Sequence, residues 1–244
     1  SSKYNEFLSN LISEKLHENW SPEQISNALL NGKLSFKTIY NWIYIGKLKG
    51  ISFKNLRHKG KRRKKETRGK FLIGNSITTR PKDVKSRKTF GHWELDTIVS
   101  SRGKSKACLA TFVERKTRFY VAIKIKDRTA PSMLKAIKKL VKVLPKKALK
   151  TFTTDRGKEF ACYKEVEKLN IKVYFADAYA AWQRGSNENS NGLLREYYPK
   201  KTDLGKISND DLIEKLILLN NRPRKCLNWD NPFNLFLKEV SHLD

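Results

Sequence analysis

The stretch His92-Trp93-Glu94-Leu95-Asp96-Thr97-Ile98-Val99 determines how the longer part of the chain folds. Its β-branched and aromatic residues follow one another without glycine or proline, which predicts a β-strand. Two more strands are expected over residues 107–114 and 118–126, because short polar turns at 100–103 and 115–117 separate the three runs. Strands joined by such short turns pair antiparallel, so the three are expected to form a meander.

Helical and strand patterns alternate after this meander. Residues 130–144 carry apolar side chains at helical spacing with lysines on the other side, and Pro145 ends the helix. A strand over 151–154, another helix and a strand over 171–175 follow. With a final helix the order is βββαβαβα, which predicts an α/β fold with a mixed sheet and helices packed against it.

The final helix begins in the polar stretch Trp182-Gln183-Arg184-Gly185-Ser186-Asn187-Glu188-Asn189. Ser186 is expected to be the N-cap, because a serine hydroxyl can accept a hydrogen bond from a first-turn amide. Glu188 then lies in the first turn, near the positive end of the helix dipole. Arg195 follows seven residues later, two turns along the same face.

The first 50 residues are expected to form helices. Ser21-Pro22-Glu23-Gln24 is a strong helix start with a capping box, and Asn31-Gly32 ends that helix before another begins after Ser35. Two short helices joined by a tight turn are typical of a helix-turn-helix. A small structural bundle that binds nothing has the same pattern.

The second of these helices has two distinct faces. Three residues suited to contacts with bases and phosphates are expected to point outward, namely Lys37, Thr38 and Asn41. Three apolar residues are expected to face the core, namely Ile39, Trp42 and Ile43.

Charge points to the class of partner. The formal net charge is +28, and lysine and arginine release counterions from phosphates, so a nucleic acid is the expected polyanion. A membrane is not expected, because no apolar run approaches the roughly 18 residues that a span needs. The densest basic run is expected to follow a phosphate backbone without reading sequence, and comprises Lys61, Arg62, Arg63, Lys64 and Lys65.

This charge pattern also sets the domain boundaries. We expect a helix-turn-helix domain over 1–50, a basic linker over 51–86 and the sheet domain over 87–244. A linker that only solubilises the chain is the alternative for the middle segment. Three widely spaced cysteines, Cys108, Cys162 and Cys226, fit neither disulfides nor zinc, so we expect small buried thiols in a reducing cytosol.

Three carboxylates fall at positions where mixed sheets build sites. Asp96 lies in the first strand, Asp155 follows the fourth strand and Glu188 begins the last helix. Clustered carboxylates repel one another unless cations neutralise them, and Mg²⁺ prefers oxygen ligands and keeps positions open for phosphates. Two such ions suit in-line displacement at phosphorus, which on a basic chain indicates phosphodiester chemistry.

At these residues the chain resembles the DDE transposases of the insertion-sequence-thirty family of bacteria. The resemblance covers most of the chain and is carried by Trp20-Ser21-Pro22-Glu23-Gln24-Ile25, Thr38-Ile39-Tyr40-Asn41-Trp42-Ile43-Tyr44, Gly91-His92-Trp93-Glu94-Leu95-Asp96, Asp155-Arg156-Gly157-Lys158-Glu159-Phe160, the stretch from Trp182 to Arg195, and Asn220-Asn221-Arg222-Pro223-Arg224. Leu95 departs from the family, which usually has a small residue there, and Ala178 and Ala181 stand where prolines are common.

The resemblance implies an RNase H-like catalytic fold, as in retroviral-type integrases. It places the metal-binding triad on Asp96, Asp155 and Glu188, with two Mg²⁺ or Mn²⁺ ions. It also implies binding of double-stranded DNA, both terminal inverted repeats and target, by at least a homodimer at the nucleoid of a bacterial cytoplasm. The family usually carries a further helix-turn-helix upstream of the one seen here.

Several single residues keep two interpretations. Glu94 shares a strand face with Asp96 and competes with it as the first carboxylate, although the resemblance favours Asp96. Trp182 is expected either to stack on an unpaired base or to pack in the core. The remaining DNA contacts predicted near the site are Arg184 and Arg195, and His92 is expected to be structural.

The expected function is DNA cleavage and strand transfer, with three rivals. The first is a catalytically idle DNA-binding regulator derived from a transposase, and the second is an RNase H-like nuclease that only hydrolyses. The third is an RNA-associated structural protein, which fits the charge but gives the three carboxylates no role.

Overall fold

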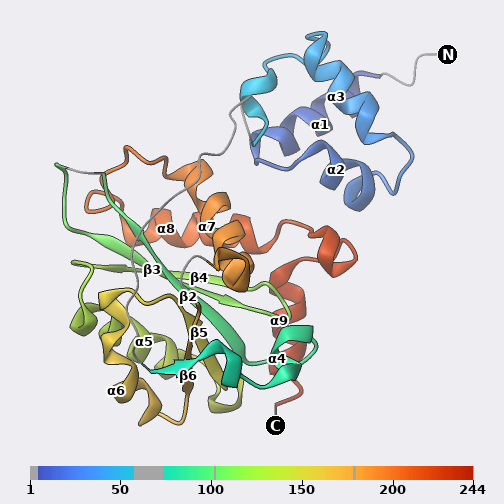
Figure 1. Cartoon of the computed structure of the whole chain (residues 1–244). Helices are drawn as coiled ribbons and strands as arrows, with labels where there is room; N and C mark the ends of the chain where they lie inside the picture. Colours follow the sequence, from blue (N-terminus) through green and yellow to red (C-terminus); the bar gives the residue numbers. More distant parts are fainter. Residues whose placement is uncertain (1–4, 58–73, 102, 178–179, 244) are drawn as a thin grey trace. The chain divides into compact units, whose positions relative to one another are not determined.

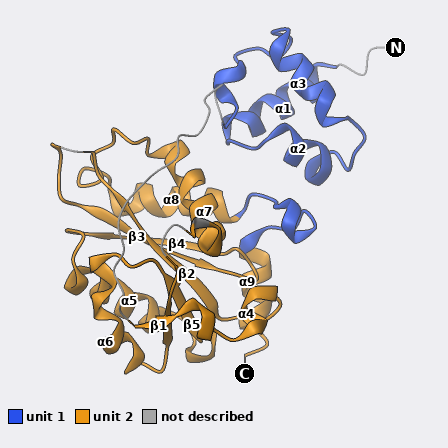
Figure 2. Ribbon diagram, in the orientation of Figure 1, with its two compact units in different colours: residues 1–66, 221–232 blue, residues 67–220, 233–244 orange. Residues whose placement is uncertain are grey.

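The structure is a computed structural model that describes residues 5–57, 74–101, 103–177 and 180–243. It divides into two compact units, one of residues 1–66 with 221–232 and the other of residues 67–220 with 233–244 (Figure 2). The predicted boundaries differ from this division, because the segment 221–232 groups with the N-terminal residues. None of the helices in the described part is long and apolar enough to cross a membrane.

The N-terminal unit is helical, as predicted. Its elements are α1 (Glu6–His17), α2 (Pro22–Gln24), η1 (Ile25–Leu29), α3 (Phe36–Tyr44), η2 (Phe53–Asn55) and η7 (Lys225–Leu227). Ser21 caps α2 and forms the predicted capping box with Gln24. The helix then widens into the π-helical turn η1, which the sequence pattern did not predict.

Helix α3 has the two faces predicted for it. Ile39, Trp42 and Ile43 are buried in a core with residues from α1 and η1. Lys37 and Asn41 are exposed on the opposite face, and Thr38 is half-buried. The three helices therefore enclose one small apolar core and leave a polar face of α3 in solvent.

The other unit is built on a six-stranded mixed sheet (Figure 1). Its strands are β1 (Asn75–Ser76), β2 (His92–Val99), β3 (Cys108–Glu114), β4 (Tyr120–Ile125), β5 (Thr151–Thr154) and β6 (Lys172–Phe175). The spatial order is β1-β6-β5-β2-β3-β4. Strands β2, β3 and β4 form the predicted antiparallel meander, while β5 pairs parallel with both β2 and β6. This is the RNase H-like arrangement that the sequence led us to expect.

Helices cover both faces of the sheet (Figure 1). Their bounds are α4 (Lys82–Ser86), α5 (Ala130–Val143), η4 (Lys146–Ala148), η5 (Lys158–Cys162), α6 (Tyr163–Glu167), η6 (Ala181–Arg184), α7 (Gly185–Tyr197), α8 (Asn209–Asn220) and α9 (Pro232–Val240). Helices α5 and α6 share one apolar core with the sheet, and α7 and α8 share another on the opposite face.

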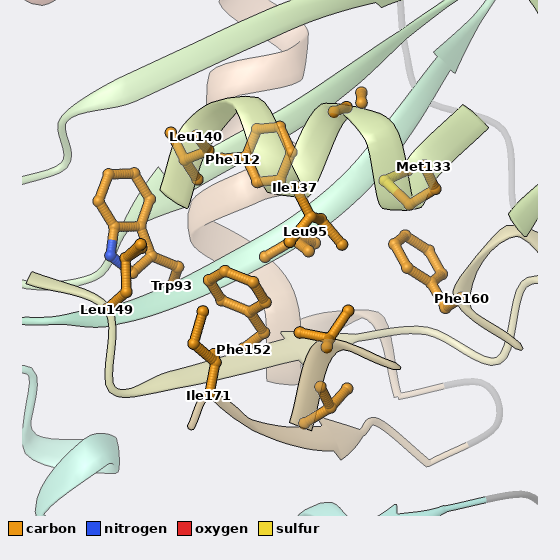
Figure 3. Close-up of a cluster of buried hydrophobic side chains, with 14 of the residues drawn as sticks. Trp93, Leu95, Phe112, Met133, Ile137, Leu140, Leu149, Phe152, Phe160 and Ile171 are labelled. Atoms are coloured by element: carbon orange, nitrogen blue, oxygen red, sulfur yellow. The ribbon is translucent and has the colours of Figure 1, made fainter. Parts of the chain in front are cut away.

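Alternation along β2 assigns its residues to these two faces. Trp93 and Leu95 belong to the core under α5, where Figure 3 shows them beside Phe152 and Ile137. Ile98 belongs to the core under α7 and α8. Because alternate residues of a strand point to opposite faces, Glu94 and Asp96 share the face of Ile98.

The structure corrects several details of the predicted elements. Residues 74–86, expected as linker, contain β1, η3 (Ile77–Thr79) and α4, whose Val84 is buried. The first helix after β5 is split into the short helices η5 and α6. Helix α7 begins at Gly185, so Ser186 is not its N-cap; its hydroxyl accepts a hydrogen bond from Arg118 Nη1 at 2.8 Å instead.

One cysteine also differs from expectation. Cys108 and Cys162 are buried as predicted, and burial raises the pKa of the Cys162 thiol to about 11. Cys226 is exposed, because it lies in the short helix η7 within the surface turn from Arg224 to Asp230.

Candidate active site

Two of the predicted carboxylates lie side by side on neighbouring strands. Asp96 is in β2, and Asp155 directly follows β5. The parallel register pairs Glu94 with Thr153, so two residues further along each strand the same register brings Asp96 beside Asp155. The pairing of β2 with β5 therefore brings together two acids that are 59 positions apart in the chain (155 − 96).

Arg184 joins these two carboxylates. Its Nη1 lies 3.6 Å from Asp96 Oδ2, and its Nη2 lies 3.2 Å from Asp155 Oδ2. Nη1 also donates to the backbone carbonyl of Leu95 at 3.2 Å. A planar guanidinium with several donors can satisfy both acids at once. Arg184, predicted as a DNA contact, is thus engaged with the candidate site itself.

The electrostatic surroundings of Asp96 favour a nearby cation. Burial raises the pKa of its carboxyl above the ordinary range, and the negative charges of Asp155 and Glu159 add to that rise. Arg184 and the backbone amide of Thr97, which donates to Oδ1 at 2.8 Å, act in the opposite direction on the pKa. A second positive charge at this position would relieve the remaining repulsion between the carboxylates.

A further carboxylate, Glu159, lies behind the pair. It is almost fully buried and accepts hydrogen bonds from Thr97 Oγ1 at 3.0 Å and from Arg128 Nε at 2.6 Å. Gly157 leaves room for this arrangement, since a Cβ there would meet Glu159 Oε2 at 2.5 Å and Asp155 Oδ1 at 2.9 Å. Sequence reasoning did not assign Glu159 or Arg128 to the site; the position of Glu159 four residues after Asp155 was the available signal.

Glu188 lies on the helix that packs over these residues. It is exposed in the first turn of α7, four residues after Arg184 and three residues before Asn191. Asn191 Nδ2 donates to Asp96 Oδ2 at 3.1 Å, and its Oδ1 accepts from the Tyr120 hydroxyl at 2.7 Å. Residues three and four apart share a helix face, so Glu188 lies between two residues that both contact the Asp96 carboxylate.

The donor chemistry of this site fits a divalent cation. Two aspartate carboxylates face a common positive charge, and oxygen ligands of this kind are those that Mg²⁺ prefers. Among the described residues, no three aspartate, glutamate, histidine or cysteine side chains are grouped closely enough to hold a metal ion as they stand.

The other predicted DNA contacts fall in different surroundings. The basic run Lys61, Arg62, Arg63, Lys64 and Lys65 lies outside the described residues. Trp182 is 76% exposed, so core packing is excluded and the stacking interpretation remains. Arg195 donates to the backbone carbonyl of Val99 at 2.8 Å and lies within 3.4 Å of two more carbonyls, which fixes its guanidinium beside the end of β2.

The rival polar residues have partners of their own. Asp177, in the loop before α7, is a further acid near the site, and its Oδ2 accepts from Gln183 Nε2 at 2.9 Å. His92 is buried, its Nδ1 lies 2.8 Å from Thr151 Oγ1, and burial lowers its pKa to about 4. Glu94 is completely buried and paired with Arg115, so it does not face the site as an open ligand.

Comparison with known proteins gives one family and several close relatives. The family described as "Integrase core domain" matches residues 86–181. The transposase of insertion sequence element IS30A from Escherichia coli K12 is 35% identical over 97% of this chain and 66% of its own length. The transposase of IS1086 from Cupriavidus metallidurans is 35% identical, with 93% of this chain and 71% of that protein covered.

Another transposase and a solved structure are also similar to the chain. The transposase of IS4351 from Bacteroides fragilis is 38% identical, with 94% of this chain and 73% of that protein covered. A solved structure, the HTLV-2 integrase catalytic core domain in complex with magnesium, is 17% identical with a TM-score of 0.44 over 59% of this chain and 93% of that chain. The chain spans 66% of the length of the Escherichia coli relative, just under two thirds.

Proposed function

The chain belongs to the IS30 type of insertion-sequence transposases, and from this we propose that it cleaves phosphodiester bonds at the ends of an insertion element and joins the freed 3′-hydroxyl to target DNA. One observation carries the proposal: Asp96 and Asp155, from neighbouring strands, share the guanidinium of Arg184 just ahead of the helix that bears Glu188. A structural ion pair would not need two acids and a third carboxylate one helical turn away.

The proposed ligands are Asp96, Asp155 and Glu188, with two Mg²⁺ or Mn²⁺ ions. When bound, such ions would supply positive charge that stabilises the charge developing at the reacting phosphate. The chain holds its carboxylates in place through backbone amides: Thr97 donates to Asp96, and Gly157 donates to Asp155 Oδ1 at 2.9 Å. These amides leave the remaining carboxylate oxygens to face the site.

The proposed reaction has two direct displacements. Water attacks first and frees a 3′-hydroxyl at the element end. That hydroxyl then attacks a phosphate of the target and displaces the 3′-oxygen of the adjoining target nucleotide, which leaves as a free 3′-hydroxyl. No covalent bond between protein and DNA is needed. The proposed substrate is double-stranded DNA, both terminal inverted repeats and target, bound by a homodimer or larger assembly at the nucleoid in the cytoplasm.

The proposed DNA contacts lie on both units. Lys37, Thr38 and Asn41 would contact DNA from the polar face of α3, and the basic run from Lys61 to Lys65 would follow phosphates. Trp182 would stack on a base near the cleaved end. Counterion release by so many lysines and arginines makes strong, salt-dependent binding the expected behaviour.

The decisive test replaces the triad while leaving the fold intact. Asp155→Asn and Glu188→Gln are expected to abolish Mn²⁺-dependent cleavage and strand transfer of an element-end duplex, with unchanged DNA affinity. Asp177→Asn is the matched control, because Asp177 is an acid of the adjacent loop paired with Gln183. Full activity of either triad variant would overturn the assignment.

The same assay separates the alternatives. A purely hydrolytic nuclease would cut the duplex but fail to join pre-cleaved ends to a target. A regulator without activity would bind ends and never nick them with Mg²⁺ or Mn²⁺. Preference for RNA, with no preference for any DNA end, would support the RNA-associated protein instead.

A further inference from the structure

Glu94, two residues before Asp96 on the same face of β2, is engaged at both carboxylate oxygens. Its Oε1 accepts from Arg115 Nη1, and its Oε2 accepts from the backbone amide of Asn187 at 2.9 Å. The side chain is completely buried. Glu94 therefore contacts the residue directly before Glu188 rather than the open side of the site.

Two more hydrogen bonds strengthen this connection. Asn187 Nδ2 donates to the Glu94 backbone carbonyl at 2.9 Å, and Asn187 Oδ1 accepts from Thr111 Oγ1 at 3.2 Å. Asn187 is fully buried, so these bonds form away from solvent. The start of α7 is thus fastened to both β2 and β3.

The contact replaces a missing helix cap. The first amides of a helix have no partner within it, and no side chain of residue 184 caps α7. The Asn187 amide belongs to that first turn and finds its acceptor in a carboxylate from another element. A buried carboxylate at the positive end of a helix gains a charge-assisted hydrogen bond there.

The buried charge of Glu94 is itself compensated. Arg115 is nearly fully buried, pairs with Glu94, and donates through Nε to the Val84 carbonyl at 3.1 Å. Two buried charges with satisfied hydrogen bonds are more costly than apolar packing, so a purely structural contact gains little from them. What they supply is a fixed direction for the start of α7.

We propose that Glu94 is a positioning residue that caps α7 and thereby sets where Glu188 stands relative to Asp96. The inference rests on the proposed function only for the metal-binding role of Glu188. One strand then carries both a triad aspartate and the anchor for the triad glutamate. Asp96 and the residue that anchors the start of α7 are thus only two positions apart on β2, so their relative position is fixed by the strand itself.

The test compares Glu94 with a second buried carboxylate. Glu114 is equally buried, and its carboxylate oxygens accept from the amides of Gly91 and Thr117 rather than from an amide of α7. The variants are Glu94→Ala, Glu94→Gln and the matched control Glu114→Ala, each with its Tm measured. Hydrogen exchange of peptides covering residues 185–191 reports the fastening of α7, and electron paramagnetic resonance of free Mn²⁺ reports metal affinity.

Exchange at 185–191 is expected to accelerate in Glu94→Ala and to change much less in Glu114→Ala, whose carboxylate does not contact α7 directly. The Kd for Mn²⁺ is expected to rise by about 10- to 100-fold in Glu94→Ala, as for lost supports of metal ligands. Glu94→Gln keeps an acceptor oxygen for Asn187 and should recover part of both losses. If Glu94→Ala does not fold, the test compares Glu94→Gln with Glu114→Ala: exchange at 185–191 and the Kd for Mn²⁺ should both increase more in Glu94→Gln.

Four results would overturn the proposal or its premise. Unchanged exchange in both Glu94 variants would show that the carboxylate does not hold the helix. Faster exchange with wild-type Mn²⁺ affinity, or an equal affinity loss in Glu114→Ala, would reduce Glu94 to a structural residue. A wild-type protein that binds no Mn²⁺ would instead refute the proposed function, while the exchange comparison still reports on the helix anchor.

Discussion

Replacing Gly157 by alanine tests the geometry of the site with one added methyl group. The backbone there is ordinary, with a φ of −68°, so alanine adds no conformational strain. Its Cβ would stand 2.5 Å from Glu159 Oε2 and 2.9 Å from Asp155 Oδ1. Relative to the 3.4 Å of an ordinary contact, Glu159 must retreat by 0.9 Å (3.4 − 2.5) and Asp155 by 0.5 Å (3.4 − 2.9).

Neither carboxylate can retreat freely. Glu159 is held by Arg128 and Thr97, and Asp155 is held by Arg184 and by the Gly157 amide. Overpacking of this kind costs about 1–3 kcal/mol of stability. A 1 Å misplacement at a catalytic group can cost on the order of 100-fold in rate. The triad residue Asp155 must move about half as far, so we expect cleavage by Gly157→Ala to fall by roughly 10-fold.

The assay is the initial rate of element-end cleavage at saturating Mn²⁺, with Tm and DNA affinity measured beside it. Gly185→Ala is the control, because a Cβ at Gly185 meets nothing within 4 Å and this glycine also lies in the site region. The control should keep its rate and gain a few tenths of a kcal/mol in stability from the restricted unfolded chain. Cleavage by Gly157→Ala at the wild-type rate would refute the crowding argument.

Two other predictions concern a buried and an exposed ring. The pKa of His92 is about 4 in the folded protein and 6.5 in the unfolded chain, so only the unfolded chain binds a proton between these values. The free energy of unfolding is therefore highest above pH 6.5 and falls as the pH falls toward 4. Between pH 7.5 and pH 5 the wild type should therefore lose about 2 kcal/mol more stability than His92→Asn, as measured by urea denaturation. A stability difference between the two proteins that does not change with pH would contradict this. Trp182→Ala should keep the Tm but weaken binding of duplexes with unpaired ends by about 1–3 kcal/mol, while blunt duplexes bind as before. Equal loss on both duplexes would argue against stacking.

The parts of the fold that could be predicted are those with local signals. The capping box at Ser21 and the apolar face of α3 depend on residues three or four positions apart, and both are confirmed. The meander of β2, β3 and β4 was predicted in the same way, from short turns between apolar runs. Neighbouring residues determine these features, so sequence alone is enough.

The predictions were wrong where a residue distant in sequence determines the local structure. Serine is a common N-cap residue, but the Ser186 hydroxyl accepts a hydrogen bond from Arg118, and Glu94 of another element caps the helix instead. Strand β1 has two residues and exists only because it pairs with β6. Trp182 gave no local sign of its exposure, since an aromatic residue beside a helix start is as compatible with burial as with solvent.

The candidate site shows the same division. Asp96 and Asp155 could be proposed from their places inside the first strand and directly after the fourth, and the parallel pairing of these two strands brings them together. The choice between Glu94 and Asp96 could not be made from spacing, because both share one strand face. Arg115, which follows β3 and neutralises Glu94, is what separates their roles in the structure.

The alternation along β2 has a consequence for how the chain can change during evolution. The side chains of Trp93 and Leu95 pack in the core beneath α5, so a substitution there can be compensated by a change in a neighbouring core residue. Glu94 and Asp96 lie on the opposite face and depend on α7, so drift there is tied to the site itself. One face of β2 can therefore vary together with the core residues packed against it, whereas the other face is constrained by the adjacent site.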